Sequence, residues 1–208
     1  MSRPARTTPD DAIERAGPVA WPDALIAGLD EVGRGPLAGP VVAAAVILDP
    51  EAVPDGLDDS KRLKPEERAR LSAEIMRDAR AVAIVALPAP AVDRLNIRAA
   101  ALLAMSRAAH ALAIRPERAL VDGNVRPPHL PCRSDAIVKG DARSVSIAAA
   151  SIIAKVARDR MMERAEREWP GYGFAQHKGY PTAAHLAAIE QHGACPLHRR
   201  SFGPLKQL

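Results

Sequence analysis

A glycine-rich turn that carries two adjacent acids separates two apolar segments near the start of the chain. The segments span residues 24–29 and 40–48, and each reads as a short buried strand because it is uncharged and rich in Ala, Val, Ile and Leu. Between them runs the sequence LDEVGRGPLAG, in which Asp30 and Glu31 directly follow the first strand. Acids at a strand end are typical of an α/β sheet, where they gather in the crevice beyond the carboxyl ends of the strands.

The rest of the chain alternates further apolar strands with helical segments. We expect strands over residues 81–87, 119–121 and 136–138, and helices over residues 65–80, 96–114, 144–168 and 182–191. This order predicts a single α/β domain over residues 23–208. Residues 1–22 are polar and contain several prolines, and we expect them to form a mobile arm.

Composition limits the class of protein. A chain of 208 residues with 48% hydrophobic residues can bury a core without disulfides or structural metals. The two cysteines, Cys132 and Cys195, form no CxxC pair, which favours a reducing compartment. No apolar run reaches the roughly 18 residues of a membrane span, and no signal peptide is evident. We therefore expect a cytoplasmic protein without a membrane partner.

Charge is distributed unevenly along the chain. Residues 1–110 contain 14 Lys and Arg against 16 Asp and Glu, whereas residues 111–208 contain 15 against 9. The sequence pI is about 9.4. A basic half suits a polyanionic partner such as nucleic acid, but solvated helices often carry a similar excess. Charge alone leaves both interpretations open.

Four carboxylates stand at the ends of expected strands or just before an expected helix: Asp30, Glu31, Asp122 and Asp141. Carboxylates gathered in one crevice repel one another unless cations neutralise them. Hard oxygen ligands suit Mg²⁺ or Mn²⁺, and a pair of such ions is a common device for displacement at phosphorus. A strand-end Asp can also be a simple turn former, which explains one such residue better than it explains four.

The glycines do not fit the common phosphate-binding patterns. Gly33, Gly35 and Gly39 are spaced one residue too long for GxGxxG, and no Lys-Ser/Thr pair completes a P-loop. HExxH and GxSxG are also absent from the sequence, so a zinc protease or a serine hydrolase is unsupported. Glycine permits close approach of another backbone, and Arg34 between two glycines could direct a guanidinium at a nucleic-acid strand.

The chain resembles bacterial type 2 ribonuclease H (ribonuclease HII) over about residues 24–204. The resemblance is carried by motifs in a fixed order: DEVGRG (30–35), DSK (59–61), VDGN (121–124), KGD (139–141), SIAAASIIAKVARDR (146–160), HKGY (177–180) and HRRSF (198–202). It implies a ribonuclease H-like mixed β-sheet flanked by helices, with a helical C-terminal part over about residues 169–208. Arg34 and the short leader distinguish the chain from type 3 enzymes, which usually carry Lys at this position and an extra N-terminal domain.

The resemblance also implies an activity. The expected enzyme is a metal-dependent endoribonuclease that hydrolyses the RNA strand of RNA/DNA hybrids and nicks 5′ of single ribonucleotides embedded in duplex DNA. Two divalent ions, Mn²⁺ or Mg²⁺, are expected with substrate, and the products would carry 5′-phosphate and 3′-hydroxyl ends. The implied role is removal of ribonucleotides and RNA primers during DNA replication and repair, by a monomer.

Site residues follow from the same motifs. The resemblance assigns catalysis and metal binding to Asp30, Glu31, Asp122 and Asp141. It assigns contact with the backbone and 2′-hydroxyls around the ribose to Gly33, Arg34 and Gly35, and recognition of the junction with DNA to Tyr180. We add Ser60, Lys61 and Lys178 as substrate-binding candidates, and we favour phosphate contact by the two lysines over the alternative that they are solvated surface charges.

The C-terminal aromatic and histidine residues have a simpler expected role. We expect Trp169, Phe174 and Phe202 to form a small apolar cluster, and His177 and His198 to be structural. Two other functions stay open: a metal-dependent nuclease or strand-transfer enzyme of the same fold, and a non-catalytic hybrid-binding module. The first would not need the glycine-arginine-glycine turn together with Tyr180, and the second has no reason to keep four acids.

Overall fold

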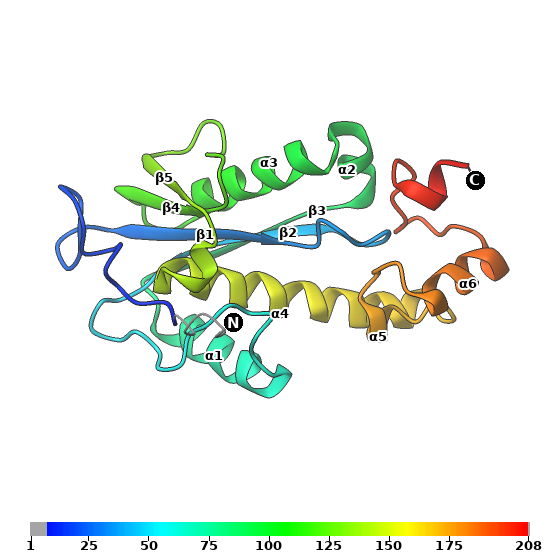
Figure 1. The fold of residues 1–208 in the computed structure, drawn as a ribbon, viewed down its shortest axis with the longest axis horizontal. Helices are drawn as coiled ribbons and strands as arrows, with labels where there is room; N and C mark the ends of the chain where they lie inside the picture. The colour runs from blue at the N-terminus through cyan, green and yellow to red at the C-terminus, as the bar shows by residue number, and fades with distance from the viewer. Residues whose placement is uncertain (1–7, 208) are drawn as a thin grey trace, which may run out of the picture.

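The computed structural model describes residues 8–207 as a five-stranded sheet with helices on both faces (Figure 1). The strands are β1 (Ile26–Val32), β2 (Val41–Ile47), β3 (Ala81–Leu87), β4 (Arg118–Asp122) and β5 (Arg133–Ile137). The helices are α1 (Pro65–Asp78), α2 (Ala89–Leu95), α3 (Ile97–His110), α4 (Val145–Glu168), α5 (Phe174–His177) and α6 (Ala183–His192). Short 3₁₀ turns lie at Gly140–Ala142 and Gly203–Gln207.

The sheet is mixed, with strand order β3-β2-β1-β4-β5. β1 pairs antiparallel with β2 and parallel with β4, and β5 extends the parallel part. Because β1 and β4 run in the same direction with Leu29 opposite Val121, the next residue of each, Asp30 and Asp122, lie beside each other. The mixed sheet confirms the fold class that the resemblance implies.

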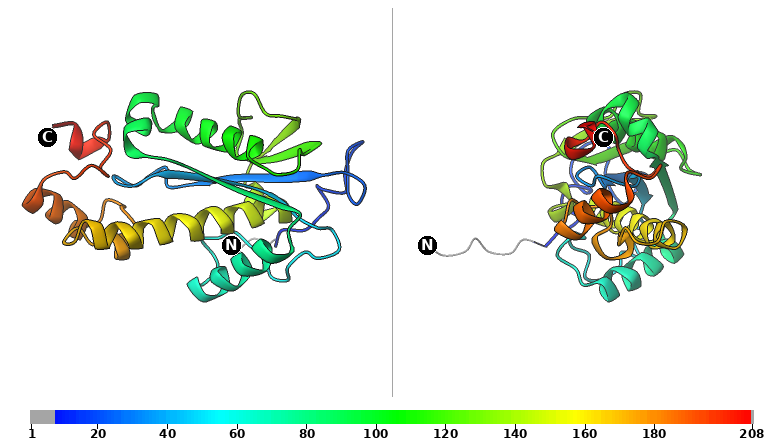
Figure 2. Two further views of the ribbon diagram at one scale, coloured as in Figure 1. Left: turned by 180° about the vertical axis from the view of Figure 1, so that it is seen from behind. Right: turned by 90° about the vertical axis from the view of Figure 1, so that its right-hand side faces the viewer.

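Alternating side chains of the strands pack against helices on opposite faces. Ile26, Val42 and Leu120 face α4 and α1, whereas Leu29 and Val121 face α3. Figures 1 and 2 show α4 running along one face of the sheet with α1 outside it, and α3 along the other. α4 extends past the sheet, and α5 and α6 gather at its far end, which confirms a helical C-terminal part.

α4 lies so close to β1 that the strand needs glycine at the contact. A β-carbon at Gly28 would collide with the backbone carbonyl of Ser146 and lie 2.5 Å from the Ile147 nitrogen. We expect Gly28→Ala to lower the free energy of unfolding by about 3 kcal/mol or more, because backbone cannot yield as a flexible side chain can. Urea unfolding measures this effect. Gly203→Ala is the control, since its β-carbon would meet no atom within 4 Å, and an equal loss in both variants would contradict the prediction.

Most expected elements are present, with two differences. The helix expected over residues 96–114 is present as α3, but a further helix that was not expected, α2, precedes it, and Asn96 separates the two with a left-handed φ of 67°. Its side chain accepts the Ala99 N–H at 3.0 Å and caps α3 as expected. β1 continues to Val32, so Asp30 and Glu31 lie within the strand rather than after it.

Part of the expected N-terminal arm packs on the domain. Residues 1–7 lie outside the described residues, but Glu14 is fully buried and accepts hydrogen bonds from the Ser144 hydroxyl and the Ser146 N–H at the start of α4. Arg118 donates to the carbonyls of Ile13, Ala16 and Val19. The expectation of a mobile arm over residues 1–22 therefore does not describe these positions, and the single-domain boundary at residue 23 stays a prediction.

None of the helices within residues 8–207 combines the length and apolar character that a membrane span requires.

Candidate active site

Asp30 and Asp122 occupy neighbouring positions on the central parallel strands. Asp30 is only 6% exposed, and it accepts hydrogen bonds from the Glu31 N–H at 2.7 Å and from the Ser151 hydroxyl of α4. Asp122 accepts the Gly140 N–H at 2.7 Å. That bond joins the end of β4 to the 3₁₀ turn carrying Asp141, so three of the four predicted acids belong to one connected region.

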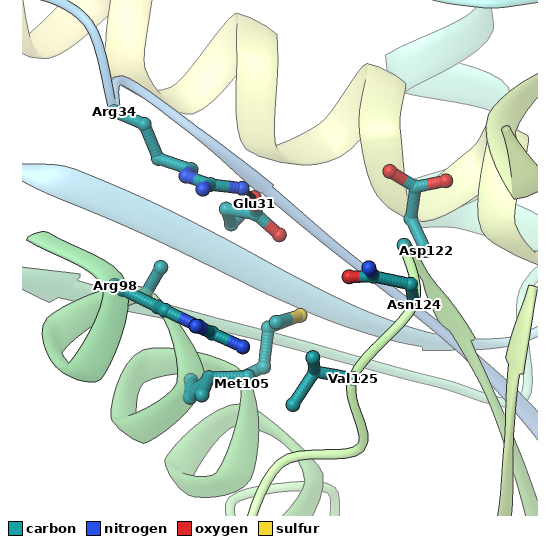
Figure 3. Close-up of a pocket in the computed structure, with 10 residues that line it drawn as sticks. Glu31, Arg34, Arg98, Met105, Asp122, Asn124 and Val125 are labelled. Carbon is teal, nitrogen blue, oxygen red and sulfur yellow. Dashed lines mark hydrogen bonds and ion pairs between the residues drawn. The ribbon is translucent and has the colours of Figure 1, made fainter. Parts of the chain in front are cut away.

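Glu31 points toward the opposite face of the sheet because adjacent strand residues alternate. Its Oε1 pairs with an Arg34 guanidinium nitrogen at 3.0 Å, which fixes the first residues of the glycine turn beside the acid. Figure 3 shows Glu31 and Arg34 on one side of a small cavity, with Asp122 and Asn124 on another and Arg98 rising from α3. The cavity has a volume of about 80 Å³.

Lys61 lies at the opposite edge of the acid cluster. Its ammonium nitrogen is 3.8 Å from the Asp141 Oδ2, and its side chain is 75% exposed. Burial acts to lower the pKa of Lys61, but the carboxylates of Asp59 and Asp141, with Asp30 and Asp122 behind them, raise the pKa overall. The ammonium therefore lies at the solvent edge of the carboxylates, and its contact with phosphate stays a prediction.

Burial and mutual repulsion disfavour the charged forms of three of the four acids. Burial, followed by the charges of Glu31 and Asp122, raises the pKa of Asp30 well above its usual value. Burial also raises the pKa of Glu31, although Arg34 acts in the opposite direction. The pKa of Asp141 is raised by burial and by Asp122. A divalent cation would offset this repulsion, and the oxygen donors are those that Mg²⁺ and Mn²⁺ prefer.

The carboxylates alone do not complete an ion site. Among residues 8–207, no three Asp, Glu, His or Cys side chains are arranged so that they could hold a metal ion by themselves. Mg²⁺ is commonly bound through one or two carboxylates, with water and substrate phosphate oxygens as its other ligands. The arrangement therefore fits ions that are held jointly by the protein and a nucleic-acid backbone.

Two of the predicted substrate contacts are engaged within the protein. Ser60 is 3% exposed, and its hydroxyl lies 2.8 Å from that of Ser151, the residue that bonds Asp30. The Lys178 ammonium pairs with Glu163 of α4 at 2.8 Å. These positions favour a supporting role for Ser60 and a structural ion pair for Lys178 over direct substrate contact.

The glycine turn meets the Tyr180 segment. A β-carbon at Gly35 would lie 3.5 Å from Cε1 of the Tyr180 ring, so these two residues, distant in sequence, are neighbours. Tyr180 is 42% exposed. Gly179 packs so tightly against the Ala38 carbonyl that a β-carbon would collide with it. The structure therefore brings together the turn and the tyrosine to which the resemblance assigns ribose and junction recognition.

Buried histidines hold the Tyr180 backbone from beneath. The Cys195 N–H donates to Nδ1 of His198 at 3.0 Å, so His198 carries its proton on Nε2, which lies 3.1 Å from Nε2 of His185. His185 then carries its proton on Nδ1 and donates to the Tyr180 carbonyl at 2.9 Å. Only neutral rings fit this chain of bonds. The structural role expected of His198 and Phe174 is confirmed, since both are buried and their ring centroids lie 5.7 Å apart in the C-terminal cluster, against which Trp169 also packs. Phe202 packs instead against Leu37, Ile189 and Leu205, so the expectation that it joins Trp169 and Phe174 is wrong.

This arrangement predicts loss of stability in mild acid. Burial, with a smaller contribution from His185, lowers the pKa of His198 to about 4. In the unfolded chain His198 becomes protonated near its ordinary pKa of 6.5, whereas in the folded protein it stays neutral down to about pH 4. The stability that neutral His198 contributes is therefore fully present above pH 6.5 and is lost as the pH falls toward 4. The full effect is on the order of 3 kcal/mol.

Urea unfolding at several pH values between 7 and 4 gives the free energy of unfolding of the parent protein and of His198→Gln, and the test is the difference between these two free energies. The difference should shrink as the pH falls. His192→Gln is the control because His192 is exposed. A difference that does not change with pH would contradict the prediction.

Some residues of the site carried too weak a signal in the sequence. Ser151 supports Asp30 from within an alanine-rich helix, where its small size was sufficient explanation. Arg98 reads as one more exposed helix charge, and only the packing of α3 brings it to the cavity. Asn124 was not predicted either, although its position two residues after Asp122 at a strand end was the clearest signal among these residues.

Comparison with known proteins assigns the family. A family model described as ribonuclease HII matches residues 27–204. The chain belongs to the ribonuclease HII family. Membership supports ribonuclease H activity, that of a hydrolase acting on RNA in RNA/DNA hybrids.

Similar ribonuclease HII proteins occur in several bacteria. The protein of Sinorhizobium medicae (strain WSM419) is 56% identical over 202 residues, which cover 96% of this chain and 92% of that protein. The ribonuclease HII of Marinomonas sp. (strain MWYL1) is 56% identical over 184 residues, covering 88% of this chain and 92% of that protein.

Solved structures share the fold. Ribonuclease H2 from Pyrococcus horikoshii OT3 superposes with a TM-score of 0.73 at 26% identity, covering 88% of this chain and 95% of that one. A ribonuclease HIII, Bst-RNase HIII, crystallised with Mn²⁺, has a TM-score of 0.73 at 24% identity and covers 92% of this chain but 72% of that one. These matches show that the same fold extends over most of the chain.

Proposed function

We propose that this ribonuclease HII nicks duplex DNA on the 5′ side of single embedded ribonucleotides and also cuts the RNA strand of hybrids. The products carry 3′-hydroxyl and 5′-phosphate ends, and the role is removal of ribonucleotides and RNA primers from DNA. The observation that supports this proposal is the close approach of the Tyr180 ring to Gly35, in the turn that follows Glu31. It puts a feature suited to reading ribose next to the groups suited to cutting a phosphodiester.

The four carboxylates are the proposed ligands of two divalent ions, Mg²⁺ or Mn²⁺. When bound, such ions activate water and stabilise charge at the phosphate. Asp30, Glu31 and Asp122 provide oxygen donors from adjacent strands, and Asp141 provides one from the turn before α4. Support comes from the raised pKa values of Asp30, Glu31 and Asp141, since burial and mutual repulsion disfavour charge there until a cation arrives.

The glycine turn is the proposed reader of the ribonucleotide. A protein distinguishes RNA from DNA at one position by contact with the 2′-hydroxyl. Gly35 has no side chain that would fill the space beside the Tyr180 ring, and Arg34 is held toward Glu31 by its ion pair. Gly33 has a left-handed φ of 89°, and a β-carbon there would collide with the buried Arg158 side chain, so this position requires glycine. The exposed ring of Tyr180 is placed to pack against the following sugar, where a 2′-hydroxyl would be left without a polar partner.

A comparison of substrates tests this function directly. The protein with Mg²⁺ or Mn²⁺ is incubated with duplex DNA containing one ribonucleotide, an RNA/DNA hybrid, single-stranded RNA and all-DNA duplex. We expect cleavage of the first two only. Cleavage of all-DNA duplex at a similar rate would instead indicate a general nuclease of the same fold.

Binding should also depend steeply on salt, because Lys and Arg that neutralise phosphates release counterions. If roughly four phosphates are contacted, affinity should fall by about a hundredfold between 50 and 200 mM salt. Fluorescence anisotropy in Ca²⁺, which should prevent cutting, measures this dependence. In Lys61→Gln the logarithm of the affinity should fall less steeply with the logarithm of the salt concentration. Lys64→Gln, at the start of α1, is the matched control. An affinity that is independent of salt would contradict a nucleic-acid substrate.

A further inference from the structure

The loop between β1 and β2 directs most of its carbonyls at two buried arginines. Arg199, from the C-terminal segment, is fully buried, and its guanidinium donates to the carbonyls of residues 33, 34, 36 and 39. The distances lie between 2.6 Å for Gly33 and 3.1 Å for Arg34. One side chain therefore fixes the orientation of several peptide groups of the turn.

Arg158 holds the second half of the same loop and extends to another segment. It is fully buried in α4, and it donates to the carbonyls of Ala38 at 3.1 Å and Pro40 at 3.0 Å. Its remaining nitrogen donates to the Lys178 carbonyl at 2.9 Å, two residues before Tyr180. Arg158 is thus a direct bridge between the glycine loop and the Tyr180 segment.

Both arginines are buried without a carboxylate partner. In the part of the chain that the structure describes, neither guanidinium forms an ion pair, and every hydrogen bond that it donates goes to a carbonyl. Burial lowers the pKa of Arg199 to about 10. Burying a charge is costly, and apolar side chains of similar size often stabilise a fold as well or better. Stability alone therefore does not explain this pair.

The inward carbonyls leave N–H groups available for a ligand. Within residues 8–207, the N–H groups of Arg34 and Gly35 have no hydrogen-bond partner, whereas those of Leu37 and Gly39 bond Gly179 and Leu197. Unpaired N–H groups on such a turn form a concavity that attracts oxygen acceptors. The two guanidiniums add positive charge behind it. The free donors lie in the part of the loop nearest Tyr180.

We infer that Arg158 and Arg199 are positioning residues that hold the Gly33–Gly35 turn and Tyr180 in one fixed arrangement and thereby set the selectivity for a ribonucleotide over a deoxyribonucleotide. This inference rests on the proposed function and deepens it. Neither side chain reaches the substrate, since both are fully buried. Lysine at either position keeps the charge, but its donors sit on one ammonium nitrogen and cannot reach the carbonyls that the planar guanidinium bonds from three separate nitrogens.

The test measures the ratio of two affinities, one for duplex DNA with a ribonucleotide and one for duplex DNA without it, rather than the rate of cleavage. The affinities of the parent protein, Arg158→Lys and Arg199→Lys are measured in Ca²⁺ for duplex DNA with and without one ribonucleotide, at a temperature where circular dichroism shows each protein folded. We expect each variant to lose at least about tenfold in the ratio of the two affinities, with little change in affinity for all-DNA duplex.

Arg118→Lys is the matched control. Arg118 also donates to three loop carbonyls, but these belong to the N-terminal segment. This variant should melt earlier and keep the parent ratio. Arg158→Lys and Arg199→Lys proteins that melt earlier yet keep the parent ratio would overturn the inference. A parent protein without preference for the ribonucleotide would instead overturn the proposed function.

A measurement on the parent protein decides the matter if the variants do not fold. The Nε–H signals of Arg158 and Arg199 are followed by NMR while each duplex is added in Ca²⁺. We expect them to shift with the ribonucleotide-containing duplex and to stay unchanged with all-DNA duplex. Equal shifts with the two duplexes, or no shift with either, would refute a role in selectivity.

Discussion

Replacing any one of the four clustered acids by its amide is expected to reduce turnover by more than about a hundredfold, because loss of even an outer partner of a metal ligand costs about 10–100-fold. The variants are Asp30→Asn, Glu31→Gln, Asp122→Asn and Asp141→Asn. Steady-state cleavage of a duplex with one ribonucleotide, in Mg²⁺ and in Mn²⁺, measures the loss. The control is Asp49→Asn, which removes a partly exposed carboxylate paired with Arg80. Near-normal cleavage by two or more of the four variants would refute the assignment.

The same substitutions should not unfold the protein. The fold raises the pKa of Asp30, so its carboxylate is destabilising at neutral pH and becomes less so as the pH falls. Asp30→Asn is therefore expected to raise the melting temperature of the metal-free protein at pH 7, by a few degrees. Calorimetry with a chelator tests this, and a lower melting temperature would show that the hydrogen bonds of Asp30 outweigh the repulsion.

Loss of the Tyr180 ring is expected to impair cleavage at a single ribonucleotide by about tenfold or more, since ring stacking on a nucleotide is worth about 1–3 kcal/mol. Tyr180→Phe keeps the ring and should retain most of the activity, whereas Tyr180→Ala should not. The ring is 42% exposed, so Tyr180→Ala should change the free energy of unfolding by only about 0.5 kcal/mol. Cleavage rates and melting temperatures of both variants separate recognition from stability.

Leu186→Ala is the matched control for Tyr180→Ala. Leu186 is 39% exposed on the nearby α6, and its loss should leave cleavage unchanged. Suppose Tyr180→Ala melts early but cuts the junction normally in the cold. The tyrosine is then structural, and the junction is read elsewhere, with the glycine-arginine-glycine turn the first place to look.

The sheet and its main helices could be predicted because local pattern and tertiary packing agree there. The continuous apolar run of β2 reads as a strand buried on both faces, and all seven residues are buried. α4 was predicted within one residue at its start, where Ser144 caps it. α2 was missed because Pro88 and Pro90 read as a break, although proline suits the first turn of a helix.

The acid cluster could be predicted in outline but not in orientation. Strand ends brought Asp30 and Asp122 together as expected, but only the structure shows that β1 continues through both acids and turns Glu31 toward α3. The buried hydrogen bonds of Ser60 and Arg199 depend on segments far apart in sequence. No local pattern distinguishes such a residue from an exposed polar one, and the packed position of Glu14 was missed for the same reason.

Mapping the cut in a DNA duplex that contains one ribonucleotide tests the proposed cleavage most directly. The strand is labelled at each end in turn, and the products made in Mg²⁺ or Mn²⁺ are compared with synthetic markers of defined termini. We expect one nick, at the phosphodiester on the 5′ side of the ribonucleotide, which leaves a 3′-hydroxyl on the preceding deoxynucleotide and a 5′-phosphate on the ribonucleotide. A nick on its 3′ side, or 2′,3′-cyclic phosphate ends made without divalent metal, would contradict this expectation.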